Sequence, residues 1–500
     1  MKEKIIANYF GTGWTALMSF VFTPLYIKYL GPESYGLVGV YAMIQGWMIL
    51  LDVGLSPTLS REVSMYKAGV YVDKEIKEIF SSIEMIYIVL GISSGFLLII
   101  FSSWISRNWL QINNLSLDVV ASSVICFSFL IVFRWVSGLY SATIMGAQDI
   151  IWYNITRSIF STLRGAGVIV VLHLVLSDIR VFFVYQAIIV LFELIVLRFR
   201  ILRILPSPKK ALLFSLKSIS KIWKFAGGMA VITFLGIMLK QIDKIMLSKM
   251  MSLTEFGYYS LASVVSGIII LIVQPIINIA YPVIAELRAK NKSDVEVIKK
   301  YHFFSQMVSI VSIPIGLFFS LYSVQILTLW IGDKVIVDKI SSIVSIMVLG
   351  NVVNNIMIMP YLLQISGGWT SLSLWSNIIY VIIFGPVIYF GYNYYGLIMV
   401  PIAWLVINVI NVIFQVQVMH KKIYCEEMGR WYYKDIGIPF FVSSLILIGS
   451  KILFYKIDIV SNVGVFLYLF LVLIVTILCS LIAMDYMRLK INKILNNILL

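Results

Sequence analysis

The sequence predicts an all-α integral membrane protein with about 14 transmembrane helices: two parallel-repeat six-helix lobes and a C-terminal helix pair. Three observations predict this fold. Of the 500 residues, 60% are hydrophobic and the mean hydropathy is +0.96, well above soluble domains. Only 13% of the residues are charged, and they fall in short stretches between long apolar runs. An internal repeat relates most of these runs in two sets.

Composition also excludes several classes of protein. The net charge of +15 would suit nucleic acid, but no segment between the apolar runs is long enough to form a soluble basic domain. Cys126, Cys425 and Cys479 lie in or beside apolar runs without CxxC spacing, so we expect neither a disulfide nor a zinc site. No metal-ligand, phosphate-loop or hydrolase motif is present. We therefore expect no cofactor, with coupling to H⁺ or Na⁺ left open, and no enzyme.

The predicted spans follow in chain order. The first apolar run, after a short basic start, has no signal-peptide cleavage site, so we predict a retained helix. The spans centre near Met18, Gly46, Leu90, Phe129, Val168 and Ile189, then near Leu235, Ile269, Val311, Leu349, Val381 and Val406, and finally near Ile446 and Leu471. The predicted parts are an N-lobe (1–200), a basic linker (201–221), a C-lobe (222–420), a final pair (435–487) and a tail (488–500).

Orientation follows from the basic clusters. When the loops are assigned to alternate sides, the Lys and Arg clusters all fall on the side of the N-terminus, which the positive-inside rule makes cytoplasmic. The clusters occupy residues 61–77, 198–224, 288–300, 421–434 and 488–493. Both chain ends are therefore predicted to be cytoplasmic, and most of the net charge needs no ligand to explain it.

The internal repeat appears when the chain is shifted by about 221 residues. Lys28 then falls on Lys249, and Tyr35-Gly36 falls on Phe256-Gly257. The first two helices fall on the seventh and eighth. Such a repeat predicts two lobes of like orientation, related by an axis along the membrane normal.

Polar residues at helical spacing mark one face of the first helix of each lobe. Residues on helix one include Thr12, Thr15 and Ser19, and residues on helix seven include Thr233, Lys240 and Asp243. We predict that Thr12, Thr15, Ser19 and Thr233 line a cavity and that Lys240 and Asp243 act in gating or coupling. Helix packing explains the hydroxyl residues equally well, and snorkelling or a local ion pair explains the charges.

Three charges lie deeper in the first lobe, namely Arg134, Arg164 and Glu193. A charge at the middle of the bilayer costs on the order of 3 kcal/mol, so these imply pairing, a wet cavity or an anionic ligand. Glu193 can neutralise only one of the two arginines, and guanidinium groups match phosphate oxygens. The sequence therefore predicts an anion site at Arg134 and Arg164, with a purely structural Arg–Glu bridge as the alternative.

The remaining polar candidates are less specific. Asp52 and Glu193 are further candidates for gating or coupling. Alternatively, Asp52 only caps or pairs near a helix end. Asn351 and Asn355 in the tenth span either line the cavity or bind neighbouring helices. His173 is expected to be a buried, satisfied histidine, whereas His302 and His420 border loops.

Several segments resemble a known family. Helix one ends in Tyr26-Ile-Lys-Tyr-Leu-Gly-Pro-Glu-Ser-Tyr-Gly36, and the next helix closes with Asp52-Val-Gly-Leu-Ser-Pro57 and Arg61-Glu62. A third segment, at the predicted junction of the seventh and eighth helices, is Gln241-Ile-Asp-Lys-Ile-Met246 followed by Glu255-Phe-Gly-Tyr258. These segments resemble polysaccharide transporters, the Wzx-type O-antigen and capsule flippases of the multidrug/oligosaccharidyl-lipid/polysaccharide superfamily.

The resemblance implies a function. It implies two lobes around a cavity lined by helices one, two, seven and eight, and movement of undecaprenyl-diphosphate-linked sugar units from the cytoplasmic to the outer leaflet of the bacterial inner membrane. It also implies contact with membrane lipids and with glycan polymerase or assembly proteins, and a monomer. No nucleic acid is implied.

Two other classes remain as alternatives. A cation-coupled multidrug exporter of the same superfamily would prefer acidic cavity residues, whereas intramembrane Arg and Lys outnumber Asp and Glu here. A membrane enzyme of the same pathway, such as a repeat-unit polymerase or an acyltransferase, would need a long outer loop or an intramembrane catalytic His. The predicted outer loops are short, and only His173 lies inside a span.

Overall fold

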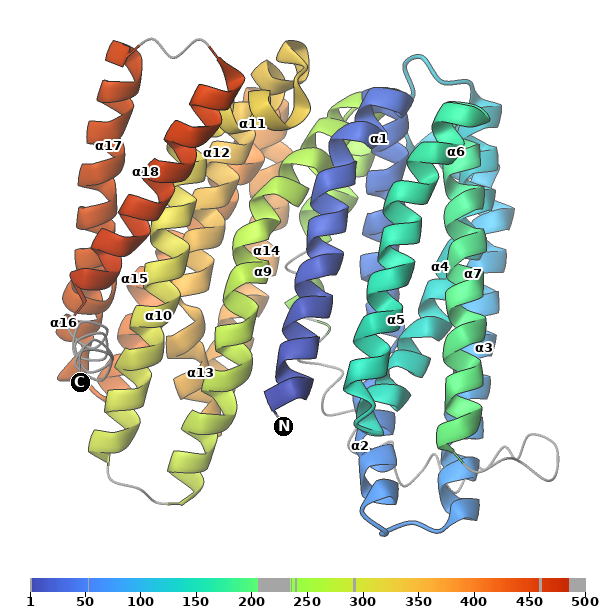
Figure 1. Ribbon diagram of the computed structural model, residues 1–500, viewed down its shortest axis with the longest axis horizontal. Helices are drawn as coiled ribbons and strands as arrows, with labels where there is room; N and C mark the ends of the chain where they lie inside the picture. The colour runs from blue at the N-terminus through green and yellow to red at the C-terminus, as the bar shows by residue number, and fades with distance from the viewer. Residues whose placement is uncertain are drawn as a thin grey trace. The chain divides into compact units, whose positions relative to one another are not determined.

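The computed structural model describes residues 2–52, 54–205, 234, 236–238, 241–290, 294–457 and 461–484. Helices joined by short connections make up the described chain, and its β pairing is limited to an isolated bridge between Gln111 and Ser252 (Figure 1). The chain divides into two compact units, Met1–Ser260 and Leu261–Leu500.

The first unit runs from α1 to the beginning of α9 and includes two short π-helical segments, labelled η1 and η2. Its elements are α1 (Lys2–Leu51), α2 (Leu55–Lys67), α3 (Asp73–Trp104), η1 (Ile105–Trp109), α4 (Leu117–Gly146), α5 (Ile150–Thr162), η2 (Leu163–Gly167), α6 (Val168–Leu174), α7 (Ile179–Ile204) and the start of α9 (Leu253–Ala289).

The longest element, α1, contains two helices joined at a kink. Its 50 residues would measure about 75 Å if straight, more than twice a hydrocarbon core of roughly 30 Å. Gly31 breaks the helix with φ 79° and ψ 163°, a conformation that glycine adopts without strain. Pro32 then begins the second part of α1. Proline has no backbone N–H, and at the first position of a helix that group would have no partner within the helix, so no hydrogen bond is lost. Figure 1 shows one part rising and the other descending, so α1 accounts for the first two predicted spans.

Two glycines allow α1 to pack closely on the start of α9. A Cβ atom on Gly36 would lie 2.1 Å from the carbonyl oxygen of Leu253, and a Cβ on Gly257 would lie 2.2 Å from the carbonyl oxygen of Pro32. The 221-residue shift carries Pro32 onto Leu253 and Gly36 onto Gly257. The two segments therefore contact each other reciprocally, as repeat-related elements do where they meet at a two-fold axis.

A buried carboxylate fixes the loop between η1 and α4. Glu33, just after the kink, is 6% exposed. It accepts hydrogen bonds from the backbone N–H groups of Asn113 at 2.7 Å and Asn114 at 2.9 Å. Hydrogen bonds from backbone donors compensate a buried carboxylate, so this contact ties the loop to the second part of α1.

In the first unit, α4 packs against α2, α3 and α7. Small residues permit the contact with α3: a Cβ on Gly95 would lie 2.5 Å from Cγ2 of Val132. Small residues at helix interfaces are typical of membrane bundles, because they let the backbones approach. This packing places Arg134 of α4 next to α1 and α7, where the candidate site lies.

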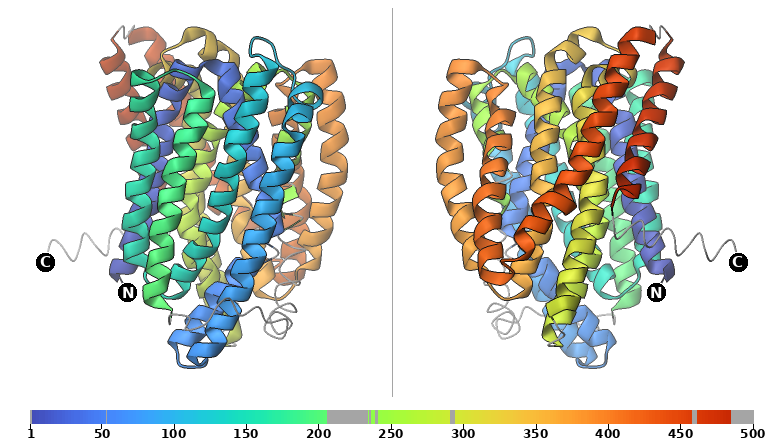
Figure 2. Two further views of the ribbon diagram at one scale, coloured as in Figure 1. Left: turned by 90° about the vertical axis from the view of Figure 1, so that its right-hand side faces the viewer. Right: turned by 90° about the vertical axis from the view of Figure 1, so that its left-hand side faces the viewer.

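The second unit contains the rest of α9 and the helices that follow it. They are α10 (Asp294–Leu321), α11 (Ser323–Ile331), α12 (Lys334–Ile356), α13 (Ile358–Ser366), α14 (Ser371–Tyr395), α15 (Met399–Ile423), α16 (Glu427–Arg430), the π-helical segment η3 (Trp431–Gly437), α17 (Ile438–Ile457) and α18 (Asn462–Ile482). Figure 2 shows these helices from two further sides. A core of buried apolar side chains joins α9, α10, α13, α15 and η3, with Tyr301, Met359 and Trp431 at most 1% exposed.

Twelve helices among the described residues are long and apolar enough to cross a membrane. One of them is the kinked α1, and the predicted span near Leu235 falls largely outside the described residues. The predicted all-α membrane fold is confirmed, and the number of spans comes close to the predicted 14 without confirming it. The predicted linker (201–221) and tail (488–500) lie mostly or wholly outside the described residues, so the lobe boundaries stay predictions.

Large apolar side chains cover the outer faces of the later helices. Ile382 of α14 is 66% exposed, Phe441 of α17 is 66% exposed and Leu471 of α18 is 61% exposed. Such faces are too apolar for water, and their helical backbone suits contact with lipid.

Candidate functional site

Two adjoining cavities lie within the first unit. One, of about 250 Å³, is lined by α1, α4, α5, η2 and α7, and the other, of about 370 Å³, by residues of α1, α3 and α4 and by Asp52 and Ser56. Gln45 and Arg134 line both. We call the smaller one the arginine cavity, because Arg134 and Arg164 both line it, and the larger one the Asp52 cavity.

The π-helical turn η2 positions Arg164. A wide turn leaves backbone carbonyls without their usual α-helical partners, and such turns often occur at functional sites. Here the side chains of α7 satisfy them: Gln186 Nε2 donates to the carbonyl oxygen of Arg164 at 3.0 Å, and the Tyr185 hydroxyl donates to that of Leu163 at 2.9 Å. The turn therefore holds Arg164, which is 8% exposed, against α7.

Glycine makes this close contact possible. A Cβ on Gly165 would lie 2.4 Å from the Phe22 ring of α1, and a Cβ on Gly167 would lie 1.8 Å from the Tyr185 hydroxyl. Substitution at either position would displace the Phe22 ring or the Tyr185 hydroxyl from the turn. The run Leu163-Arg-Gly-Ala-Gly167 therefore suits a charged side chain clamped between two helices.

Two guanidinium groups share one carboxylate at the arginine cavity. Arg164 Nη1 donates a hydrogen bond to Glu193 Oε2, and Arg134 Nη1 lies 3.8 Å from the same oxygen. The Arg134 side chain is 29% exposed, whereas that of Glu193 is 7% exposed. The Nε atom of Arg134 is buried and has no hydrogen-bond partner among the described residues. The three groups carry a net charge of one positive unit, and Arg134 keeps donors to offer.

The arginine cavity has a polar rim of uncharged side chains. Thr15, Ser19 and Gln45 of α1 and Gln186 of α7 line it with Tyr41. The Thr15 hydroxyl donates to the carbonyl oxygen of Gly11 at 2.8 Å, which leaves its lone pairs free to accept. Hydroxyl and amide groups beside a cation pair can bind sugar hydroxyls and phosphate oxygens.

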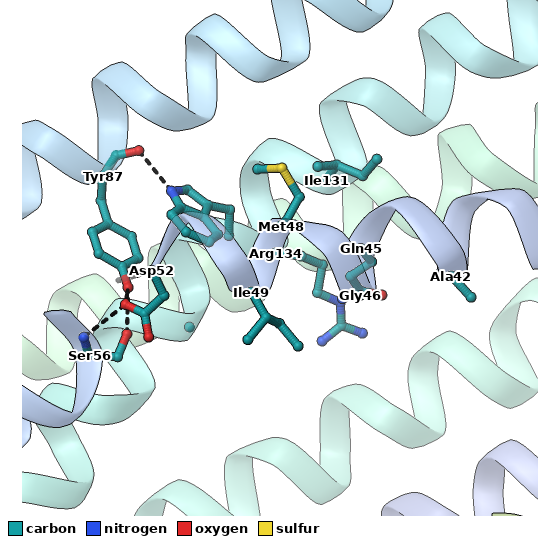
Figure 3. Close-up of a pocket in the computed structure, with 12 residues that line it drawn as sticks. Ala42, Gln45, Gly46, Met48, Ile49, Asp52, Ser56, Tyr87, Ile131 and Arg134 are labelled. Carbon is teal, nitrogen blue, oxygen red and sulfur yellow. Dashed lines mark hydrogen bonds between the residues drawn. The ribbon is translucent and has the colours of Figure 1, made fainter. Parts of the chain in front are cut away.

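The Asp52 cavity has a hydrogen-bonded carboxylate at one end. Figure 3 shows Asp52, Ser56 and Tyr87 gathered there, with Arg134 beside Gln45 at the other end. Asp52 Oδ1 accepts hydrogen bonds from the Tyr87 hydroxyl and from the backbone N–H of Ser56 at 2.9 Å. The second bond satisfies a backbone N–H in the first turn of α2, whose N-cap residue is Gly54, so Asp52 pairs at a helix end.

An aromatic contact fixes Tyr87 in turn. The Tyr87 ring stacks on Trp135 with centroids 4.6 Å apart, and Trp135 Nε1 donates to the carbonyl oxygen of Tyr87 at 3.0 Å. Sequence reasoning missed both residues. They carry no charge, and an aromatic residue in an apolar span gives no signal that separates a cavity wall from a lipid-facing position.

The predicted places of the three histidines were wrong. His173 is exposed, because it lies near the end of the short helix α6. His302 and His420, expected at loop borders, are 0% exposed and lie within the apolar helices α10 and α15.

The other predicted site residues lie elsewhere. Thr12 is half-buried on α1 and lines neither cavity. In the second unit, Asn351 Nδ2 donates to the carbonyl oxygen of Ser266 at 3.0 Å, and Asn355 Nδ2 donates to that of Ile269 at 3.4 Å. Both asparagines therefore bond to the backbone of α9, an arrangement typical of helix packing.

The predicted gating pair is described only in part. Thr233 and Lys240 lie outside the described residues. Asp243 lies in the helical stretch before α9 and accepts a hydrogen bond from the hydroxyl of Tyr259, which is 2% exposed. Its other oxygen is buried without a hydrogen-bond partner among the described residues.

The described residues hold no group of three or more His, Cys, Asp or Glu side chains arranged to bind a metal ion. The polar side chains that line the two cavities carry guanidinium, carboxylate, hydroxyl and amide groups. Such groups bind an anion and polar ligand atoms.

Comparison with known sequences identifies similar proteins. A Shigella flexneri protein described as "Putative O-antigen transporter" is 21% identical over 412 residues, which cover 80% of this chain and 93% of that protein. A Salmonella typhi protein with the same description is 23% identical over 272 residues, or 53% of this chain and 60% of that protein.

Comparison with solved structures identifies the fold. The lipid II flippase MurJ in an inward closed conformation matches with a TM-score of 0.72 and 15% identity, over 96% of this chain and 98% of that one. An inward-facing multidrug resistance MATE family transporter of the MOP superfamily matches with a TM-score of 0.63 and 13% identity, over 83% and 96%. The chain therefore has the fold of these transporters.

The match to a described family covers more than half of the chain and includes both cavities. Residues 1–288 match the family described as polysaccharide biosynthesis protein, in agreement with the resemblance carried by the first two helices. The chain belongs to this polysaccharide biosynthesis protein family.

Proposed function

We propose that the chain is a flippase for undecaprenyl-diphosphate-linked oligosaccharide repeat units of an O-antigen, capsule or exopolysaccharide. It moves them from the cytoplasmic to the outer leaflet of a bacterial inner membrane by alternating access. The family and the relatives described as O-antigen transporters support the class of cargo. The fold shared with a lipid II flippase supports the class of movement.

The arrangement of Arg134, Arg164 and Glu193 carries the proposal. Two guanidinium groups on one carboxylate leave a positive charge beside a cavity inside the membrane-spanning unit. An unneutralised charge in this environment is costly, so an anionic ligand that completes the pairing is stabilised. A diphosphate presents several oxygens that match guanidinium donors.

The size of the arginine cavity limits which part of the cargo it holds. A volume of about 250 Å³ suits a diphosphate and its first neighbours, not a whole oligosaccharide. In this proposal Arg134 and Arg164 bind the diphosphate, and Thr15, Ser19 and Gln186 bind nearby oxygen atoms. The lipid tail stays in the bilayer, and the sugar units extend into the Asp52 cavity and beyond.

Acidic residues have the complementary role in this proposal. Glu193 holds the arginines while no cargo is bound, and Asp52 with Tyr87 forms a gate at the far end of the Asp52 cavity. Asp243 remains a candidate coupling residue. The excess of Lys and Arg in alternate loops supports a cytoplasmic location for both chain ends.

A cation-coupled multidrug exporter is the alternative within the same fold. The net positive charge of the arginine cavity disfavours it, because cationic drugs would be repelled by Arg134. An anionic cargo has no such penalty.

The test is the leaflet in which lipid-linked repeat units accumulate in cells lacking this chain. Spheroplasts of the deletion strain are probed with a membrane-impermeant glycan-binding reagent before and after permeabilisation. The proposal predicts units that are detected only after permeabilisation. Single units exposed on the outer surface would contradict it and indicate a polymerase.

Variants then test the site in the same strain. Arg134→Ala and Arg164→Ala should fail to restore outward-facing units while reaching the membrane at normal levels. Arg200→Ala is the matched control, since Arg200 pairs with Asp149 at 2.6 Å and lies over the Trp152 ring, away from both cavities. Full restoration by both cavity variants would exclude the diphosphate contact.

A further inference from the structure

A buried histidine in the second unit lies between two carboxylates. His302 of α10 is 0% exposed. Its Nδ1 lies 2.5 Å from Asp435 Oδ2 of η3, and its Nε2 lies 2.9 Å from Glu427 Oε2 of α16. One imidazole therefore joins α10 to two short segments more than a hundred residues away in the sequence.

The number of protons in these contacts follows from the chemistry of the three groups. A neutral imidazole has one N–H donor and one acceptor nitrogen, and an ionised carboxylate only accepts. Hydrogen bonds at both nitrogens therefore require two protons shared among His302, Asp435 and Glu427. With one proton fewer, one contact would bring an acceptor nitrogen against an acceptor oxygen, and the two would repel.

A second buried histidine in the same core serves as a comparison, because its hydrogen bonds have only a structural role. His420 of α15 is also 0% exposed. Its Nδ1 lies 2.9 Å from the carbonyl oxygen of Val416, and its Nε2 lies 3.0 Å from the hydroxyl of Tyr301. A single ring proton on Nδ1 satisfies both contacts, because the hydroxyl donates to Nε2. No change of protonation is needed at His420, in contrast to His302.

Of the two carboxylates beside His302, Asp435 is buried and hydrogen-bonded, whereas Glu427 is partly exposed to solvent. Gln306 Nε2 donates to Asp435 Oδ1 at 3.0 Å, and the Asp435 side chain is 0% exposed. The Glu427 side chain is 21% exposed, and its Oε2 lies 3.7 Å from Nη1 of Arg430. The titratable and charged groups around the site are Tyr301 of α10, His420 of α15, Glu427 and Arg430 of α16, and Tyr432 and Asp435 of η3.

We propose that His302, Asp435 and Glu427 form a proton-binding site whose occupancy is coupled to transport. One proton leaves a ring nitrogen of His302, passes to the Glu427 carboxylate and from there to water, and returns by the same route. Asp435 and Gln306 hold the other side of the ring. Loss of the proton breaks the contact between His302 and Glu427, so α16 separates from α10.

The segments around the site are suited to such a movement. The element α16 has four residues, and η3 is a wide π-helical turn, a type of turn that often occurs where helices adjust. They lead directly into α17, which packs on α10. Breaking the contact between His302 and Glu427 changes the position of the segment that leads into the final helix pair. A local change of charge would thereby alter helix packing.

The proton site itself can be tested without transport. The chain has three histidines, so ¹⁵N-histidine NMR of the full-length protein in nanodiscs gives few signals, and His302→Gln and His173→Gln assign them. Spectra recorded over about pH 5 to 9 should contain both the doubly protonated and the singly protonated ring of His302, the two states that the proposal requires. Asp435→Asn should change the proportion of the two states, because it removes one of the two carboxylates that share the protons.

Two NMR results would overturn the site. If His302 keeps a single proton over this whole range, it is a fixed hydrogen-bonding residue like His420. If it keeps both protons throughout, it is a permanent ion pair and exchanges nothing.

Coupling to transport rests on the proposed function and needs a separate measurement. Proteoliposomes with a trapped pH-sensitive dye receive undecaprenyl-diphosphate-linked oligosaccharide in one leaflet. The wild-type protein should change the internal pH as the lipid moves, and His302→Gln should lose this change while His173→Gln, at an exposed position, keeps it. An undiminished pH change in His302→Gln overturns the coupling. Lipid that does not move with wild-type protein overturns the proposed flippase and leaves the NMR result standing.

Discussion

Gly36 and Gly257, which stand 221 residues apart, occupy matching positions at the contact between α1 and the start of α9. Each glycine faces the carbonyl oxygen four residues before the other, that of Leu253 for Gly36 and that of Pro32 for Gly257. Gly39 and Ser260 are also related by this shift, and a Cβ on Gly39 would lie 2.1 Å from Ser260 Oγ. The repeat in the sequence thus has a physical counterpart, in which equivalent residues pack on each other.

The glycine contact predicts a stability difference between two variants of the same helix. Gly36→Ala places a methyl group against a backbone carbonyl that cannot rotate away, so it should destabilise the protein by about 1–3 kcal/mol. Gly13→Ala, also in α1, meets nothing within 4 Å and should leave stability unchanged or slightly higher. Thermal unfolding of both variants in detergent measures this, and equal melting temperatures would refute the close contact.

Because Arg134 and Arg164 share the carboxylate of Glu193, we expect an added anion to restore stability to a variant that lacks this carboxylate. Glu193→Gln leaves Arg164 buried without its counter-charge, which should cost about 3–5 kcal/mol. Undecaprenyl diphosphate should then raise the melting temperature of this variant more than that of the wild type, because it supplies the missing negative charge.

Glu84→Gln is the control for this rescue. Glu84 is a buried carboxylate of α3 that pairs with Arg198 at 2.6 Å and lines neither cavity. The substitution should destabilise the protein without any special response to the lipid. Equal rescue of both variants would show that the effect does not come from the arginine cavity.

Removing the Tyr87 hydroxyl group at the Asp52 cavity should lower the free energy of unfolding. Tyr87→Phe keeps the stacking on Trp135 and deletes a hydrogen bond to Asp52. A hydrogen bond to a charged group contributes about 1.5–3 kcal/mol, so the free energy of unfolding should fall by this order. Tyr394→Phe, at a position 80% exposed, should have no effect. If the two variants unfold alike, the Asp52–Tyr87 bond adds nothing to stability.

The N-terminus of α7 predicts a contribution to stability that depends on pH. Asp178 caps this helix, and its hydrogen bond with Arg180 lowers the pKa of its carboxyl group. A lowered pKa means that the carboxylate stabilises the folded state above its unfolded pKa of about 3.9 and that this is lost as pH falls through the folded value. Asp178→Ala should therefore cost about 1 kcal/mol at neutral pH and less in acid. A difference independent of pH would contradict this sign.

The helix pattern and the pairing of the buried charges in the first unit were predictable because their signals are local or electrostatic. Apolar runs of membrane length mark the spans whatever the tertiary structure, and in the structure the first two spans meet at the Gly31 kink. Arg134, Arg164 and Glu193 stand out because a charge inside an apolar run needs a partner, and the structure joins the three.

Contacts between distant helices were not predictable in the same way. His302 lies 133 residues from Asp435 and 125 from Glu427, and no periodicity in one helix reports on the faces of another. The same holds for Tyr87 and Asp52. For Asn351, an amide suits a cavity wall and a helix contact equally, and only the position of the Ser266 carbonyl distinguishes them.

The most direct test is the rate at which the purified full-length protein moves undecaprenyl-diphosphate-linked oligosaccharide between the leaflets of proteoliposomes. Losing one charged contact to the diphosphate should slow movement about 10- to 100-fold in Arg134→Gln and Arg164→Gln, while Arg200→Gln stays at the wild-type rate. Wild-type rates in both cavity variants, or equally fast movement of the same oligosaccharide on an uncharged lipid without the diphosphate, would contradict recognition of the diphosphate by the arginine cavity.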